Sequence, residues 1–373
     1  MGNQYVVYDE KFRFKELFDP DTGFYARTNV LDEHGNETNE EPFMRTFPGL
    51  IDVGIMGHCI HGQSGLCQKA GIQCYQDAPH SKKHNMPLSD YKRIVDECKK
   101  YHTNQLALGG AGDVDQHEDF EEILRYTRAS GIIPNFTTSG LGLTPEKAAI
   151  CKKYCGAVAV SQYSRLVDDG KGGFKESNHY TNAALKALID AGCITNVHYV
   201  LGKNTIDEAI YRLKNNMFYP GINAVIFLLH KPVGLGTKDN MLTMDDERLK
   251  EFFALIDDAN KLNFKVGFDS CSIPGILNFT KNIALESIDT CEGGRFSMYI
   301  SADMIAMPCS FDNQKLRWGV DIKNDTIMSA WNSEKFENFR NRLRGSCPNC
   351  AKRHACMGGC PIVPEIVLCK DKH

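Results

Sequence analysis

The carboxyl-terminal part of the chain carries a dense series of cysteines. Seven thiols fall within it, at Cys291, Cys309, Cys347, Cys350, Cys356, Cys360 and Cys369. Only two residues separate Cys347 from Cys350, so a turn can aim both sulfurs at one metal centre, a spacing that zinc sites and iron-sulfur clusters both use. A structural zinc domain would more naturally have four or eight ligands than seven. The series therefore favours iron-sulfur clusters over zinc.

A second group of thiols, Cys59, Cys67 and Cys74, follows the apolar run at residues 50–56, which we interpret as a strand. Three thiolates on one loop can bind three irons of a 4Fe-4S cluster and leave the fourth iron open for a substrate or cofactor. A purely structural cluster would need a fourth cysteine. This loop is therefore the candidate catalytic site.

The composition sets the chemical setting of these thiols. The chain has 373 residues and 15 cysteines, and its amino terminus has neither a basic nor an apolar segment for export. We therefore expect a cytoplasmic protein with reduced thiols, in which metal ligation explains the cysteines better than disulfides. No apolar run approaches the roughly 18 residues of a spanning helix. The 43 basic and 47 acidic residues lack a positive bias, so neither a membrane nor nucleic acid is an expected partner.

Four further thiols have a simpler interpretation. Cys98, Cys151, Cys155 and Cys193 fall on predicted helical faces or at helix ends. We expect them to be buried small hydrophobic residues.

The elements that position the candidate site alternate between apolar runs and amphipathic stretches. Strands are predicted at 50–56, 105–109, 133–138, 157–161, 196–201, 224–229 and, shorter, 265–268. Helices are predicted at 91–101, near 120–126, from 145, after 205 and at 249–256. Six or seven βα units indicate an α/β protein with a partial (β/α)6 TIM-like barrel or a complete one. Barrels carry their chemistry on the loops at the carboxyl ends of the strands.

Local signals mark three helix starts. Thr144 and Pro145 provide a cap followed by a proline in the first turn. Thr205 and Glu208 are spaced as a capping box, and Ser89 is placed to cap the helix at 91–101.

The chain divides into three predicted parts. Residues 1–48 contain a turn at 18–23 between apolar flanks and a polar stretch at 32–41, which predicts a hairpin and a solvated linker. Residues 49–280 form the barrel. Residues 281–373 form a cysteine-rich domain, because the helix and strand periodicity fades there.

From about residue 50 to the end, the chain resembles the radical S-adenosylmethionine enzymes that carry a SPASM domain. The resemblance rests on the three cysteines after the first strand, on Gly109 and Gly110 after the second, and on the carboxyl-terminal cysteine series. The family usually spaces the first three cysteines as C-x3-C-x2-C, whereas seven residues separate Cys59 from Cys67 here and six separate Cys67 from Cys74. The family's usual aromatic residue before the third cysteine is Gln73 here, with Tyr75 after it.

The resemblance implies three 4Fe-4S clusters, one catalytic and two auxiliary. Cys59, Cys67 and Cys74 would hold the catalytic cluster, whose open iron binds S-adenosylmethionine. The outer auxiliary cluster would use Cys347, Cys350, Cys356 and Cys369. Cys291, Cys309 and Cys360 would hold the inner one, which leaves one iron either open to a substrate or water, or closed by Cys271.

The same resemblance implies contacts to S-adenosylmethionine. They are expected at Tyr75, Gly109, Gly110, Asp113, Ser161 and Asn196. The family's glutamate in the glycine-rich motif is Ala111 here, and Asp113 is placed to compensate. Glycines at 109 and 110 also suit a tight βα turn whatever the ligand.

The implied function is reductive cleavage of S-adenosylmethionine to a 5'-deoxyadenosyl radical, which abstracts hydrogen from a peptide or protein and leads to its oxidative modification or cross-linking. A low-potential donor such as a flavodoxin or ferredoxin would supply the electron. The alternatives are a dehydrogenase of a small molecule and a sulfatase maturase, although Ser310 stands where sulfatase maturases have an aspartate base. The alternative without catalysis is an iron-sulfur electron carrier or a zinc-stabilised binding protein. Neither would explain why three cysteines follow a barrel strand on one loop.

Overall fold

A single curled sheet of ten strands organises the chain. The computed structural model describes residues 4–171, 173–258, 261–312, 316–345, 347, 349–353, 355–366 and 368–369. The sheet order is β12-β11-β10-β7-β6-β5-β4-β13-β14-β15. Its first seven strands run parallel and are β4 (Leu50–Met56), β5 (Gln105–Gly110), β6 (Ile133–Thr138), β7 (Ala157–Ser161), β10 (Ile194–Leu201), β11 (Ala224–Leu229) and β12 (Lys265–Phe268).

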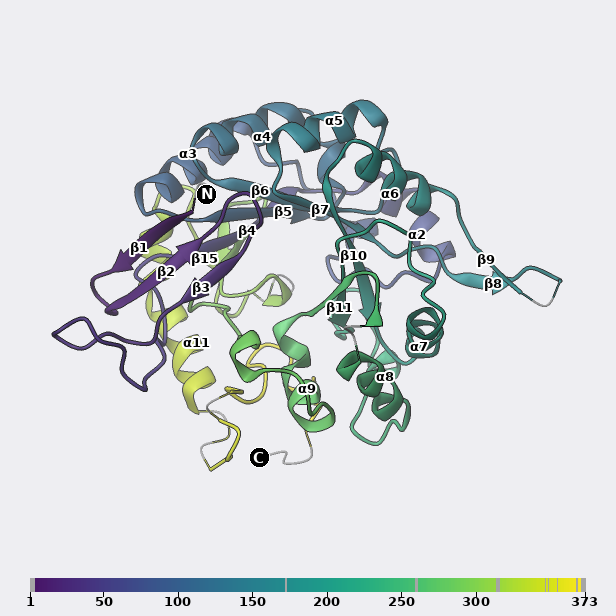
Figure 1. The fold of residues 1–373 in the computed structure, drawn as a ribbon. Coiled ribbons are helices and arrows are strands. Elements are labelled where there is room, and N and C mark those ends of the chain that lie inside the picture. Colours follow the sequence, from purple (N-terminus) through teal and green to yellow (C-terminus); the bar gives the residue numbers. More distant parts are fainter. Residues whose placement is uncertain are drawn as a thin grey trace.

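Helices cover the outer face of this sheet (Figure 1). They are α3 (Leu88–Lys100), α4 (Phe120–Ala129), α5 (Pro145–Tyr154), α6 (Tyr180–Asp190), α7 (Ile206–Lys214) and α8 (Arg248–Asp257). The helices form because apolar residues recur on one face, as at Tyr91, Ile94 and Val95 of α3, all of which are buried. Phe227 of β11 packs edge-on against Phe252 of α8 with ring centroids 5.0 Å apart. The predicted partial barrel is confirmed, and the seventh strand, β12, lies at its open edge.

The carboxyl-terminal segment continues the barrel sheet. Strand β13 (Ser297–Ile300) pairs in parallel with β4, and β14 (Ile305–Met307) and β15 (Val320–Asp321) follow in antiparallel order. Helices α9 (Ile273–Phe279) and α11 (Glu334–Gly345) lie below the sheet in the view of Figure 1. Helix α10 (Ile327–Trp331) instead contacts α3, because the backbone amides of Ile327 and Met328 donate to the Glu97 carboxylate. Segments on both sides of residue 280 therefore share one sheet.

The amino-terminal segment forms a three-stranded antiparallel sheet rather than a hairpin alone. Its strands are β1 (Tyr5–Asp9), β2 (Phe14–Phe18) and β3 (Tyr25–Arg27). The predicted turn at 18–23 joins β2 to β3, and most of the stretch 32–41 is exposed, as expected. Arg27 anchors this sheet to the carboxyl-terminal segment through Glu292, 3.5 Å away, and through the ring of Phe296.

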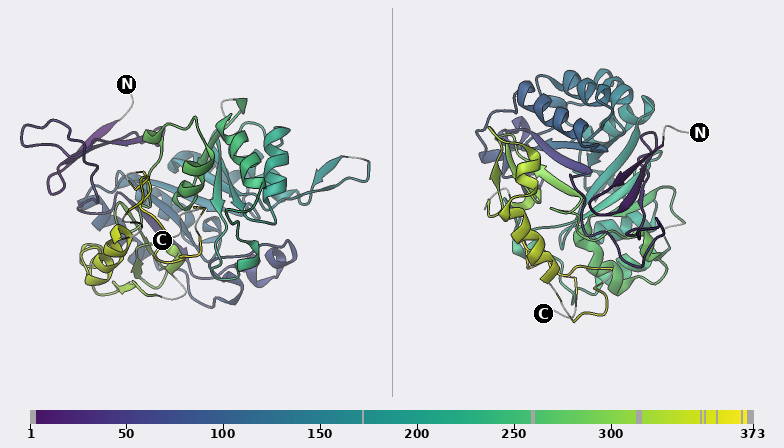
Figure 2. Two further views of the ribbon diagram at one scale, coloured as in Figure 1. Left: turned by 90° about the horizontal axis from the view of Figure 1, so that it is seen from below. Right: turned by 90° about the vertical axis from the view of Figure 1, so that its left-hand side faces the viewer.

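A second hairpin projects away from the body (Figure 2). It consists of β8 (Leu166–Asp168) and β9 (Phe174–Glu176). Among the described helices, none combines the length and apolar composition needed to cross a bilayer.

Two of the three predicted helix caps are wrong. Helix α3 begins at Leu88, so Ser89 lies inside the helix and Pro87 precedes it. Thr205 precedes α7, but its hydroxyl donates to the carbonyl of Val200 at 2.7 Å instead of capping the helix, and Glu208 pairs with Arg212. Thr144 does cap α5, by accepting a hydrogen bond from the Lys147 amide.

Candidate functional site

The loop after β4 presents the three candidate catalytic thiols at the carboxyl ends of the strands. Cys59 caps the short helix α1 (Ile60–Gln63), and its Sγ accepts a hydrogen bond from the Gly62 amide at 3.2 Å. Cys67 lies in α2 (Leu66–Lys69). The carbonyl of Cys74 accepts a hydrogen bond from the Leu235 amide at 2.9 Å, which ties the end of the loop to the segment after β11.

The structure brings these three sulfurs together. Burial and then the sulfur of Cys59, the carboxyl of Asp113 and the sulfur of Cys74 raise the pKa of Cys67 to about 11. Burial is also the main cause that raises the pKa of Cys59 and of Cys74. Clustered, half-buried thiols remain protonated without a metal, and coordination to a metal ion removes their protons.

The end of β5 lies directly beside this loop. A Cβ at Gly110, whose φ is +116°, would stand 2.4 Å from the carbonyl oxygen of Met56, so close approach of the two strands requires glycine there whatever the ligand. A Cβ at Gly109 would meet no atom within 4 Å. Gly109 therefore borders open space, where a ligand has room.

Asp113 joins the cysteine loop to the end of β6. Its carboxylate accepts hydrogen bonds from the Ser139 amide at 2.7 Å and the Ser139 hydroxyl at 2.6 Å, and it lies 3.4 Å from Nε2 of His61. Burial raises the pKa of Asp113. Nε2 of His61 is buried and lies beside this carboxylate without a hydrogen bond to it.

The two other expected contacts to S-adenosylmethionine lie at different heights in the barrel. Ser161 ends β7, on the same edge of the sheet as the cysteine loop, and pairs in register with His198 of β10. Asn196 lies nearer the amino end of β10 and accepts a hydrogen bond from Nδ2 of Asn223 at 2.9 Å. The structure therefore does not bring Asn196 to the edge that carries the cysteines.

Tyr75 connects the loop that carries Cys59, Cys67 and Cys74 to the carboxyl-terminal segment. Its ring packs against that of Phe311, which lies in a short turn after Cys309, with centroids 4.8 Å apart. Nζ of Lys231 lies 4.7 Å from the centroid of the Phe311 ring. Tyr75 is thus engaged on one side by an aromatic ring of the neighbouring segment.

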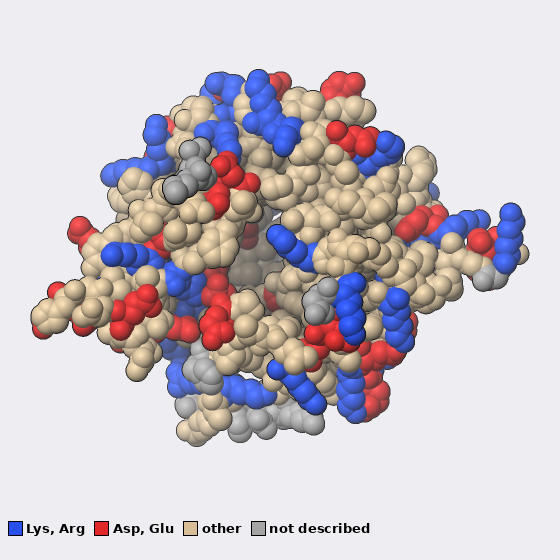
Figure 3. All heavy atoms as spheres, viewed as in Figure 1, with Lys and Arg blue, Asp and Glu red and all other residues tan. Residues whose placement is uncertain are grey.

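A cavity of about 970 Å³ occupies the barrel interior and reaches the inner group of thiols. It corresponds to the hollow at the centre of the face shown in Figure 3. Four thiols line it, at Cys271, Cys291, Cys309 and Cys360. Burial and the sulfur of Cys360 raise the pKa of Cys291 to about 11, and the same two causes raise the pKa of Cys309.

The cavity also exposes charged residues that sequence reasoning missed. Lys231 forms an ion pair with Asp269, and the carboxyl of Asp52 on β4 faces the cavity. His198 lines it as well, and burial lowers the pKa of His198 to about 4. Each of these polar residues lies in or just after a predicted apolar strand, a signal that could have identified them.

The outer group of thiols is also assembled. Burial raises the pKa of Cys356, and the nearby sulfurs of Cys369, Cys347 and Cys350 raise it further. Of the four thiols expected outside any site, Cys98 and Cys151 are fully buried, as expected, while Cys155 and Cys193 are partly buried.

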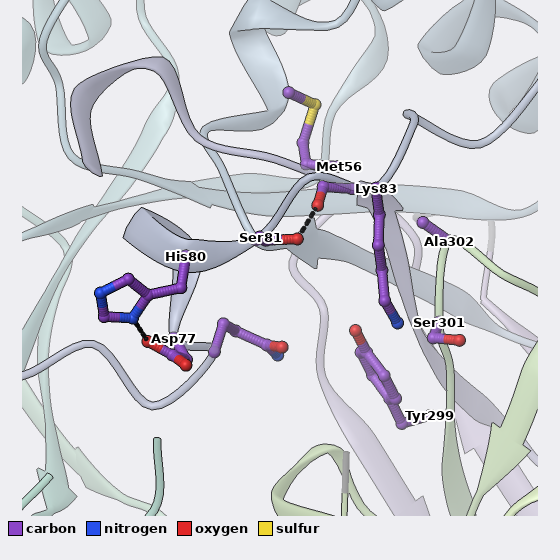
Figure 4. A pocket seen from close by; sticks show the side chains of 11 residues that line it. Met56, Asp77, His80, Ser81, Lys83, Tyr299, Ser301 and Ala302 are labelled. Atoms are coloured by element: carbon purple, nitrogen blue, oxygen red, sulfur yellow. Dashed lines mark hydrogen bonds and ion pairs between the residues drawn. The ribbon is translucent and has the colours of Figure 1, made fainter. Parts of the chain in front are cut away.

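A smaller pocket of about 250 Å³ lies between the catalytic loop and β13 (Figure 4). Asp77 and His80 form a 2.6 Å pair at its rim, and Ser81 binds the carbonyl of Gly57. Tyr299 and Ser301 close the opposite side. This pocket is polar and borders Ala111 in the glycine-rich turn.

The donor sets fit iron-sulfur clusters better than single ions. Within the described ranges, no three His, Cys, Asp or Glu side chains converge on one metal ion. A 4Fe-4S cluster does not require this convergence, because each thiolate binds a different iron. Eleven of the fifteen described thiols instead form three separate groups, two of them half-buried in loops and one facing a cavity.

Comparisons with known proteins agree with this arrangement. Residues 291–356 match the SPASM iron-sulfur cluster-binding domain. Mycofactocin maturase MftC of Mycolicibacterium smegmatis is 22% identical over 305 residues, which cover 79% of this chain and 75% of MftC.

Solved structures share the fold across most of the chain. SuiB of Streptococcus suis bound to its precursor peptide SuiA superposes with a TM-score of 0.70 at 13% identity and covers 98% of each chain. The protein anSMEcpe with bound AdoMet and the Cp18Cys peptide has a TM-score of 0.57 at 15% identity, over 87% of this chain and 91% of that one. The predicted resemblance is therefore confirmed: the chain has the fold of the radical S-adenosylmethionine enzymes and carries a SPASM domain at residues 291–356.

Proposed function

We propose that this radical S-adenosylmethionine enzyme oxidatively modifies or cross-links a peptide or protein. The observation that carries the proposal is the position of Cys59, Cys67 and Cys74 together at the carboxyl end of β4, beside the open space at Gly109. Three thiols and no fourth leave a place for a cofactor on the cluster that they would hold.

The residues around the loop have distinct tasks in this proposal. Cys59, Cys67 and Cys74 would hold the catalytic cluster, which together with S-adenosylmethionine would supply the radical chemistry. Gly109 leaves room for the methionine end of the cofactor, and the Asp113 carboxyl orients the His61 side chain. Ser161 and Tyr75 border the same edge of the barrel and would contact the remaining parts of the cofactor. Asn196 is too near the amino end of β10 to be retained in this set.

A peptide substrate is supported by the related proteins and by the size of the interior. SuiB has been solved with its precursor peptide, and MftC is a maturase. The cavity of about 970 Å³ extends to Phe311, which contacts Tyr75 of the catalytic loop. A peptide side chain would fit between the catalytic loop and the inner thiols.

The two auxiliary clusters would lie in the SPASM part of the chain. The inner cluster would bind Cys291, Cys309 and Cys360, and the outer cluster would bind Cys347, Cys350, Cys356 and Cys369. These clusters would accept the second electron lost by the substrate. A flavodoxin or ferredoxin would deliver the electron that starts the reaction. The functional units would be residues 49–280 and 281–373, joined through the β4–β13 pairing.

Anaerobic reconstitution tests the proposal. The protein should bind about twelve irons in three clusters, and with a strong reductant it should convert S-adenosylmethionine to 5'-deoxyadenosine. Replacing Cys59, Cys67 and Cys74 by alanine should abolish this conversion and leave roughly two-thirds of the iron. The matched control is C193A, which removes a thiol outside the three groups and should change neither value. Saturation at about four irons would contradict the two auxiliary clusters.

The substrate class needs a separate test. Short peptides encoded beside this gene should increase formation of 5'-deoxyadenosine, and mass spectrometry should find them lighter by two hydrogens or a multiple of two. Stimulation by a small hydroxylated molecule, with no peptide changed, would instead favour the dehydrogenase.

A further inference from the structure

We infer that Cys271 is the fourth ligand of the inner auxiliary cluster. This inference rests on the proposed function, which places a cluster at Cys291, Cys309 and Cys360. Coordination would form a bond between the Cys271 sulfur and iron and release the thiol proton to solvent. All four irons would then carry a protein thiolate, so the cluster would transfer electrons and would not bind the substrate directly.

The position of Cys271 supports this assignment. Its side chain lines the same cavity as those of Cys291, Cys309 and Cys360. Its sulfur also interacts electrostatically with the sulfurs of Cys360 and Cys291. Four thiols around one space match the number of irons in a 4Fe-4S cluster.

The turn that carries Cys271 is held in place by Asp269. This carboxylate accepts hydrogen bonds from the Ser272 hydroxyl at 2.8 Å and the Leu229 amide at 3.2 Å, and it forms an ion pair with Lys231. The turn, Ser270–Ser272, is thereby fixed on both sides of Cys271. A ligand needs this support, because loosely held side chains bind metals weakly.

Lys231 places a positive charge in the wall of the same cavity. Its ammonium group is buried in the cavity wall, donates to the carbonyl of Leu229 at 2.8 Å and acts electrostatically on Cys271 and Cys309. This ammonium group places a buried positive charge in the wall of the cavity that the four thiols share.

A bond between the Cys271 sulfur and the inner cluster would link two distant parts of the sheet. Cys271 follows β12, which is one edge of the barrel sheet, whereas Cys291 precedes β13, on the far side of β4. A cluster with ligands from both segments would join the two sides of the open barrel. Cys271 lies ahead of residues 291–356, the segment that matches the SPASM domain.

Electron paramagnetic resonance of reduced protein tests the assignment. The parent protein is the C59A/C67A/C74A variant, because only its auxiliary clusters contribute to the spectrum. C271A in this background should lose about four irons or show a shifted inner-cluster signal without any substrate. C271S should keep the fold, which circular dichroism checks, and should also shift the signal. C193A is the matched control and should give the parent spectrum.

Added 2-mercaptoethanol separates a closed cluster from an open one. A closed cluster in the parent protein has no free iron, so the thiol should leave its spectrum unchanged. Where C271A retains the inner cluster, the thiol should shift the signal of that variant. An unchanged spectrum in C271A and C271S, or a thiol-induced shift in the parent, would overturn the assignment. These outcomes leave the proposed function intact, whereas a wild-type protein that binds no iron would contradict both.

Discussion

The ring of Tyr75 packs against the ring of Phe311, with centroids 4.8 Å apart and planes inclined by 48°. Tyr75 follows Cys74 of the catalytic loop, and Phe311 lies two residues after Cys309 of the inner group. The ammonium nitrogen of Lys231 lies over the same Phe311 ring, 4.7 Å from the ring centroid. This contact joins the two proposed cluster sites through side chains rather than through a continuous strand.

We predict that the Tyr75–Phe311 contact steadies the catalytic loop. F311L should weaken the binding of S-adenosylmethionine several-fold, because Tyr75 loses a neighbour worth about 0.5–1.5 kcal/mol. Equilibrium binding to reconstituted protein measures this effect. The matched control is F174L, in the projecting hairpin, which removes a similar contact between the ring of Phe174 and that of Tyr211 in α7, with centroids 4.9 Å apart. Equal effects of both substitutions would show that Phe311 has no special relation to the site.

Gly234 should be essential for the shape of the same loop. Its φ is +62°, and an added Cβ would stand 2.4 Å from the carbonyl oxygen of Tyr75 and 2.7 Å from that of Cys74. Because these are backbone atoms, G234A must displace the segment that carries the third thiol. We expect it to lower catalytic-cluster occupancy by up to about four irons and to reduce S-adenosylmethionine cleavage in proportion.

The control for this prediction is G170A. Gly170 also has a positive φ, +74°, but an added Cβ there would meet no atom within 4 Å. Its replacement should cost only about 1 kcal/mol of stability and leave iron content unchanged. If G234A retained full iron and cleavage, the loop would be more adaptable than this packing implies.

Much of the barrel could be predicted because each unit is encoded locally. The strands predicted at 133–138 and 224–229 match β6 and β11 residue for residue. A short apolar run between two amphipathic helical stretches is typical of a buried strand. The pairing of β13 with β4 could not be predicted, because it joins segments far apart in the sequence. The cap at Thr205 failed for a related reason: its hydroxyl is used by the backbone of the preceding strand.

The candidate site was predictable to a similar extent. The position of Cys59, Cys67 and Cys74 after the first barrel strand, together with the family resemblance, set this loop apart from the carboxyl-terminal cysteine series as the candidate catalytic site. The sequence offered Cys271 only as one of two alternatives for the inner group, because its place beside Cys291 and Cys360 depends on how β12 and β13 face each other across the barrel. Asp52, a single polar residue in an apolar strand, was not predicted.

A buried ion pair should hold the amino-terminal sheet to the barrel. Glu16 and Arg45 are almost fully buried and lie 2.7 Å apart, and Glu16 also accepts from Nδ2 of Asn104 at 3.3 Å. R45M leaves the Glu16 carboxylate buried without its cation and should cost about 3–5 kcal/mol in denaturant unfolding. The exposed pair of Arg125 and Glu122 is the control, since R125M should cost under about 1 kcal/mol.

The effect of R45M should depend on pH. Burial raises the pKa of Glu16, and Arg45 opposes this rise. Removing Arg45 should raise the pKa of Glu16 in the folded protein further. Above the ordinary pKa of a glutamate, the unfolded chain then loses the Glu16 proton more readily than the folded chain, so the stability of R45M should fall as pH rises through this range. The double variant E16Q/R45M lacks the carboxylate and should not show this fall. A pH-independent loss in R45M would mean that lost packing, not charge, is responsible.

Asp52 should titrate near neutral pH. It faces the cavity from β4, and burial, with a smaller contribution from the charge of Glu292, raises its pKa to about 7. Because the folded pKa lies above the unfolded one, the stability gained from the protonated form is complete below about pH 4 and is lost as pH rises through about 7. D52N keeps a neutral side chain, so at about pH 8 it should be more stable than the wild type, by at most about 4 kcal/mol. Infrared spectroscopy of the wild type should show a protonated carboxyl band that disappears through this range and is absent from D52N. A wild-type band unaffected by the substitution would assign the titration to another carboxyl, with Glu292 the first to examine because burial raises its pKa as well.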